Sequence, residues 1–67
     1  MEILLNGDRE TIEGEKTVAE LLRDLELSTE VVRVDVNGRL LGREEYAKAR
    51  LNDGDRVEVL LFLGGGR

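Results

Sequence analysis

The C-terminus is the part of the chain whose residues point most clearly to chemistry. Gly64, Gly65 and Gly66 are consecutive, and Arg67 follows them as the final residue. Glycine has no Cβ, so its backbone can enter a channel that is too narrow for any side chain. Four extended residues reach roughly 13 Å, which is enough to carry a terminal carboxylate into the active site of another protein. The alternative is a frayed end without a function, because chain termini are often poorly ordered.

The rest of the chain offers few groups for catalysis. It contains no cysteine and no histidine, so thiolate ligands and the commonest general base are missing. Glu44 and Glu45 are adjacent, and adjacent residues of a helix do not face each other. Asp53 and Asp55 flank a glycine without the further ligands of a calcium loop, which favours a turn. We therefore predict no catalytic residue, no metal site and no bound cofactor.

Composition limits the class of protein. The 67 residues, of which 40% are hydrophobic and 37% charged, are typical of one small folded domain. The formal net charge is −5, with acids spread along the chain, whereas binding to nucleic acid needs clustered Lys and Arg. No apolar run is long enough for a signal peptide or a membrane span. We expect a cytoplasmic protein whose partners are neither nucleic acids nor membranes, and whose acidic surface suits a basic protein partner.

The elements that would hold the glycine tail begin with a hairpin and a helix. Residues 1–5 form an apolar run, Asn6-Gly7 is a favoured hairpin turn, and residues 9–13 are typical of the returning strand. Thr17 and Glu20 have the spacing of a capping box, which predicts that a helix starts there. The apolar residues at helical spacing predict its buried face, namely Val18, Leu21, Leu22 and Leu25.

Strands dominate the second half of the sequence. Residues 31–36 alternate between apolar and charged side chains, with Val32, Val34 and Val36 on one face. Asn37-Gly38 is a second hairpin signal. The elements expected after it are a short strand, a helical turn, a turn cluster and the longest strand, at residues 39–41, 44–46, 52–55 and 56–63.

This order of elements predicts an α+β fold of the β-grasp (ubiquitin-like) type. A mixed sheet of four to five strands would carry one main helix packed across it. The first and last strands would lie side by side and parallel, as is common when a helix crosses over a sheet. We expect the domain to cover residues 1–63 and a flexible glycine-rich tail to cover residues 64–67.

A partner-binding surface is predicted beside the root of the tail. Strand alternation would place Val57, Val59, Leu61 and Leu63 in the core. Leu60 and Phe62 would then face solvent, and Leu4 would join them from the first strand. Contiguous exposed apolar patches often mark protein interfaces, although a partly covered sheet edge is the alternative. The predicted partner-binding residues are Leu4, Leu60, Phe62 and Gly64.

Several segments together resemble a known family. They are Val36-Asn37-Gly38, Gly42–Tyr46, Leu51–Glu58 and the terminal Gly65-Gly66. This combination resembles the ubiquitin-like sulfur carrier proteins of thiamine biosynthesis and covers essentially the whole chain. The small subunit of molybdopterin synthase belongs to a sister family with the same fold and tail.

The resemblance implies a function for the tail. In this family a ubiquitin-activating-type adenylyltransferase uses ATP to adenylate the terminal glycine, and sulfur then displaces AMP to leave a thiocarboxylate. Thiazole synthase or another sulfur-accepting enzyme takes up the sulfur. Carried onto this chain, Gly65 and Gly66 match the diglycine, and Gly66 is the residue to be activated. Arg67 departs from the pattern, because it ties up the Gly66 carboxyl in a peptide bond. Removal by a protease, an origin outside the natural sequence, or a relative that carries no sulfur would each account for it.

Other functions stay open at this point. The sulfur could go to thiamine, to molybdopterin or to tRNA thiolation. The same tail and surface would serve a ubiquitin-like modifier that is joined to lysines of target proteins. A plain interaction module with an unused tail is the third alternative.

Overall fold

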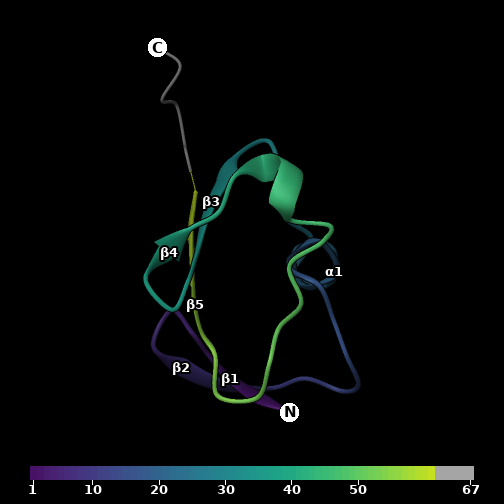
Figure 1. Cartoon of the computed structure of the whole chain (residues 1–67), viewed down its shortest axis with the longest axis vertical. Coiled ribbons are helices and arrows are strands. Elements are labelled where there is room, and N and C mark those ends of the chain that lie inside the picture. The colour runs from purple at the N-terminus through teal and green to yellow at the C-terminus, as the bar shows by residue number, and fades with distance from the viewer. Residues whose placement is uncertain (62–67) are drawn as a thin grey trace.

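The computed structural model describes residues 1–61, which form a sheet of five strands, one α-helix and one turn of 3-10 helix (Figure 1). The predicted domain boundary at residue 63 and the tail lie outside the described residues. The elements in chain order are β1 (Glu2–Leu5), β2 (Asp8–Thr11), α1 (Val18–Asp24), β3 (Val32–Val36), β4 (Arg39–Leu40), η1 (Arg43–Glu45) and β5 (Arg56–Leu61).

The sheet has the strand order β2-β1-β5-β3-β4. β1 and β5 are parallel, and the other neighbouring pairs are antiparallel. The parallel pair is joined by backbone bonds, since the Leu4 N–H donates to the Asp55 carbonyl and the Asn6 N–H to the Val57 carbonyl, both at 2.9 Å. A parallel pair needs a crossover connection, and α1 lies within it. The mixed sheet with one helix confirms the predicted β-grasp fold and its parallel first and last strands.

The start of α1 is the capping box that the sequence predicts. The Glu20 backbone N–H donates to Thr17 Oγ1 at 3.2 Å, and the Thr17 N–H donates to Glu20 Oε1 at 2.8 Å. Each side chain thus satisfies a backbone donor that the helix leaves without a partner.

Loss of this cap has a measurable effect on stability. We expect Thr17→Ala to lower the free energy of unfolding by about 1 kcal/mol, because the Glu20 N–H loses its acceptor. Urea unfolding followed by circular dichroism measures the change. Glu20→Gln is the matched control, because its amide oxygen still accepts from Thr17, and it should change stability much less. An unfolding curve of Thr17→Ala that overlays the parent would contradict the role of the cap.

The helix ends earlier than its apolar pattern predicts. Leu25, expected on the buried face, is 39% exposed. Leu25 is the C-cap residue, and Glu26 follows it with φ +61°, so the chain turns away from the helix axis. Leu27 packs against the core in place of Leu25, and its N–H donates to the Leu22 carbonyl at 2.9 Å. The left-handed conformation of Glu26 therefore leaves Leu25 exposed and brings Leu27, two positions later, against the core.

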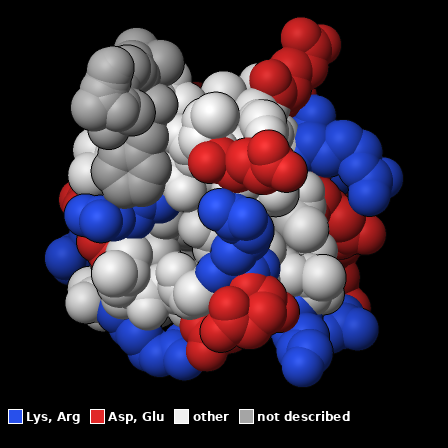
Figure 2. Space-filling view, turned by 90° about the horizontal axis from the view of Figure 1, so that it is seen from above, with Lys and Arg blue, Asp and Glu red and all other residues white. Residues whose placement is uncertain are grey.

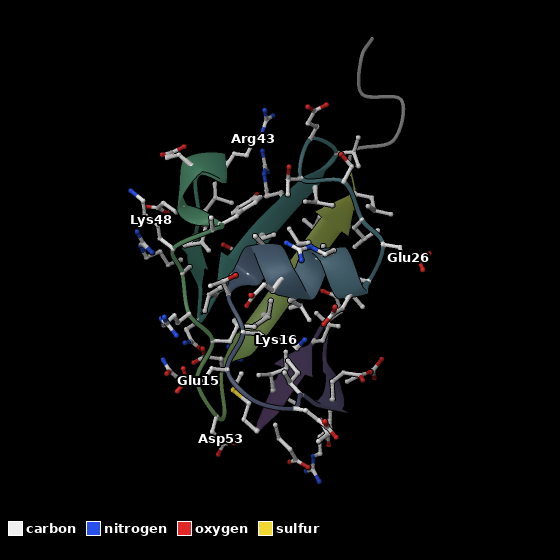
Figure 3. The ribbon with its side chains drawn as sticks, turned by 90° about the vertical axis from the view of Figure 1, so that its right-hand side faces the viewer. Glu15, Lys16, Glu26, Arg43, Lys48 and Asp53 are labelled. Carbon is white, nitrogen blue, oxygen red and sulfur yellow. The ribbon has the colours of Figure 1, made fainter. Side chains whose placement is uncertain are left out.

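The core lies between α1 and one face of the sheet. Figure 3 shows α1 crossing in front of β5, and Figure 1 shows it seen along its axis beside the sheet. Its central side chains are fully covered, namely Ile3, Val18, Leu22, Val34 and Val57. Of the described helices, none is long and apolar enough to cross a membrane. The opposite face of the sheet carries no described helix (Figure 1), and its positions on β1, β3 and β5 are exposed or partly exposed.

Candidate functional site

The uncovered face of the sheet presents two of the predicted partner-binding residues. Leu60 of β5 is 57% exposed and Leu4 of β1 is 39% exposed. The strand pairing sets Leu60 opposite Arg33 of β3 and Leu4 beside Arg56 of β5. Both leucines therefore face solvent next to an arginine, as alternation along the strands predicts.

The register does not bring these two leucines into one patch. Leu4 lies level with Arg56, four residues before Leu60 on the same strand. At about 3.3 Å per residue, the separation along the sheet is about 13 Å. Glu58 lies between them and places a charge there. The register therefore separates Leu4 from Leu60, while the partner-binding role of both stays a prediction. The other two predicted residues, Phe62 and Gly64, lie outside the described residues.

The end of β5 exposes more apolar surface than predicted. Leu61, expected in the core, is 47% exposed, and Val31 is 39% exposed. Val31 directly precedes Val32, the strand partner of Leu61. α1 crosses β5 (Figure 3), and a helix with its side chains is about 10 Å wide, whereas the six residues of β5 span roughly 20 Å, so the helix cannot cover the whole strand. We call the group Val31, Arg33, Leu60 and Leu61 the β5-end surface; it lies around the end of the strand, with Leu60 on the uncovered face and Leu61 on the face of buried Val32.

Charged side chains of both signs lie beside Leu60 on the sheet. Figure 2 shows basic and acidic side chains interspersed over the face that it presents, without a continuous area of one sign. On the sheet, Asp35 pairs with Glu58, next to the pair of Arg33 and Leu60. A small apolar centre with a charged rim is the usual anatomy of a protein–protein interface.

The carboxylates singled out in the sequence serve the fold. Asp55 is 8% exposed, and it accepts from Asn37 Nδ2 at 3.0 Å and from the Asn52 N–H at 2.8 Å. Asp53 accepts from the Glu2 N–H at 2.8 Å, which holds the turn against β1. Glu45 forms an ion pair with Arg39 at 3.0 Å. Within residues 1–61, no group of three or more acidic side chains is placed to hold a metal ion. These contacts assign Asp53 and Asp55 to turn structure rather than to a calcium loop.

Two asparagines have contacts that the sequence pattern did not indicate. Asn6 and Asn37 occupy the predicted hairpin turns with φ +51° and +54°. Their side chains also bond to β5, at the backbone of Val59 and of Arg56 respectively. The Asn-Gly dipeptide signals a turn, but nothing in it indicates which distant strand the amide will meet.

Comparison with known proteins agrees with the fold. A family model described as the ThiS family matches residues 3–66. The Sulfur carrier protein ThiS of Bacillus subtilis is 36% identical over 50 residues, which covers 75% of this chain and 76% of that protein. A crystal structure of a thiamine biosynthesis protein (ThiS) from Geobacter metallireducens superposes with a TM-score of 0.84 at 40% identity, covering 98% of this chain and 100% of that one.

A further similarity is to part of a larger enzyme. The Thiazole synthase of Paramagnetospirillum magneticum is 33% identical over 66 residues, and that of Magnetococcus marinus is 36% identical over 67 residues. The matches cover 98% and 100% of this chain but only 20% and 21% of those proteins. The chain therefore spans about a fifth of the length of the thiazole synthases that it matches.

Proposed function

The chain belongs to the ThiS family, and we propose that it carries sulfur for thiamine biosynthesis as a thiocarboxylate on Gly66, after removal of Arg67. The observation that carries this proposal is the match over residues 3–66, because it includes both the β-grasp domain and Gly65-Gly66. The protein is a carrier rather than an enzyme. Its domain supplies a recognition surface, and its last residues supply the reacting group.

The proposed chemistry takes place at the Gly66 carboxyl in the active site of a partner. An adenylyltransferase joins this carboxylate to AMP from ATP and releases pyrophosphate. A sulfur nucleophile attacks the acyl carbon, the bond to AMP breaks, and the carboxyl oxygen is replaced by sulfur. The chain itself needs no base and no metal for these steps, which is in keeping with its lack of histidine and cysteine.

Thiazole synthase is the proposed acceptor of the sulfur. Two proteins of that name contain a region similar to this chain. A carrier region within the same polypeptide as the enzyme that consumes its sulfur supports a direct pairing between the two. The β5-end surface is the part of the described domain that we propose for such contacts, because it is apolar and exposed.

Intact mass tests the proposal. A chain ending at Gly66 is incubated with a thiamine-pathway adenylyltransferase, ATP and sulfide. We expect a gain of about 16 Da, because one oxygen is exchanged for sulfur. The chain that keeps Arg67 is the matched control, and its mass should not change. No gain in the chain ending at Gly66 would overturn the proposal, and adducts with lysines of other proteins on a denaturing gel would indicate a modifier instead.

A further inference from the structure

The side chain of Asn6 is paired with β5 beyond the end of β1. Asn6 Oδ1 accepts from the Val59 N–H at 2.8 Å, and Asn6 Nδ2 donates to the Val59 carbonyl at 3.2 Å. These are the two backbone groups that a neighbouring strand would bond. A side-chain amide therefore takes the place of a strand at this point of the sheet.

The contact with Asn6 lies near the end of β5, the strand that leads to the C-terminus. β1 ends at Leu5, which lies level with Val57. Backbone groups of alternate residues point to the same side of a strand, so Val59 is the next residue of β5 to face β1. Asn6 extends the pairing on this side from Val57 to Val59, while β3 on the other side is paired as far as Leu61. The last part of β5 is thus held on both sides.

Asn37 forms a matched contact at the opposite end of β5. Both asparagines have positive φ and precede a glycine that also has positive φ. Asn37 Oδ1 accepts from the Arg56 N–H at 2.9 Å, at the first residue of the strand. The two turns share this backbone conformation and an Oδ1 contact to β5, but Asn37 Nδ2 donates to Asp55 Oδ1 at 3.0 Å, whereas Asn6 Nδ2 donates to the Val59 carbonyl. This similarity provides an internal control.

We propose that Asn6 is a positioning residue for the activation of the C-terminus. By holding Val59, it orients Leu60 on the β5-end surface and fixes the point from which the following residues begin. Gly66 lies seven positions after Val59, a distance along the chain that can span at most roughly 23 Å, so the place where the end of β5 is held limits where the reacting carboxyl can reach. This inference rests on the proposed function, in which Gly66 enters a partner's active site.

The first experiment measures the pairing itself and does not depend on the proposed function. Asn6→Gly and Asn37→Gly both tolerate positive φ and remove the side chain with its amide, and Asn37→Gly also removes the donor to Asp55 Oδ1. Amide hydrogen exchange followed by NMR should show protection of Val59 falling at least about tenfold in Asn6→Gly, with Arg56 unchanged. Asn37→Gly should show the reverse. Unchanged exchange of Val59 in Asn6→Gly would overturn the inference.

The second experiment measures the effect on activation, with both variants and the parent ending at Gly66. In adenylation by the thiamine-pathway enzyme, we expect Asn6→Gly to raise KM about tenfold, equivalent to about 1.4 kcal/mol, with kcat within about twofold. Asn37→Gly should leave KM unchanged. Asn6→Asp keeps the acceptor for the Val59 N–H but loses the donor to its carbonyl, so its KM should be intermediate.

The outcomes separate a positioning role from a purely structural one. Equal rises of KM in Asn6→Gly and Asn37→Gly would mean that Asn6 acts through stability alone and would overturn the inference. A parental KM in Asn6→Gly would overturn it as well. If the parent chain is not adenylated at all, the proposed function fails, whereas the exchange of Val59 still decides whether Asn6 holds the end of β5.

Discussion

Replacing Gly65 with valine is expected to lower kcat/KM for adenylation by more than about 100-fold, because displacing a reacting group by about an ångström has an effect of that order. In the proposed mechanism the backbone at residue 65 passes through a narrow channel of the partner, and a branched side chain would hold the Gly66 carboxyl back. Pyrophosphate release with a chain ending at Gly66 measures the rate. The free energy of unfolding should not change, because the buried core within residues 1–61 lies between Ile3 and Val59.

A graded series makes this expectation sharper. Gly65→Ala adds only a methyl group and should lose less activity than Gly65→Val. The melting temperature of each variant is the control for folding. Adenylation of Gly65→Val at the parental rate would show that the activating enzyme does not need a terminus free of side chains, and the proposed threading of the tail would then be wrong.

Replacing Leu60 with glutamate is the second change for which we expect a large effect. The substitution puts a charge into the centre of the β5-end surface, where a partner would exclude water. Residues at such a centre commonly contribute about 2 kcal/mol, so the dissociation constant of the complex with the adenylyltransferase should rise about 30-fold. Isothermal titration calorimetry measures this change. Folding should be little affected, because Leu60 is 57% exposed.

Leu40 provides a matched control on the same face of the sheet. It is 54% exposed and lies on β4, opposite Asp35. Leu40→Glu adds the same charge to the same protein but away from the end of β5, so it should leave the affinity close to that of the parent. Equal losses in the two variants would mean that the effect comes from net charge, and the β5-end surface would not be the interface.

Local signals in the sequence predicted most of the elements. The Asn-Gly turns have the positive φ that this dipeptide favours, and Thr17 with Glu20 forms the capping box. The observed strands and the 3-10 turn differ from the predicted ranges by a residue or two within the described part of the chain. These features depend on neighbours a few positions apart, so their physical causes are contained in short stretches of sequence.

Burial was predicted wrongly where the apolar pattern of a helix or a strand was continued to the end of the element. Leu25 and Leu61 both continue an apolar pattern, yet both are exposed. A period states which way a side chain points, but it does not state whether another element reaches far enough to cover it. The expectation that Leu4 adjoins Leu60 failed for a related reason, because the level of Leu4 relative to Leu60 depends on the register between β1 and β5.

The sequence by itself therefore determined the β-grasp order of elements, the turns, the helix cap and the terminal glycines, because each depends on residues close together in the chain. Only the tertiary structure decided what lies beside the end of β5. It placed Asn6 against Val59, 53 residues away, and left Leu60 and Leu61 uncovered by α1. The physical reason is that register and coverage are set by contacts between distant segments, whose free energies depend on how the whole core packs.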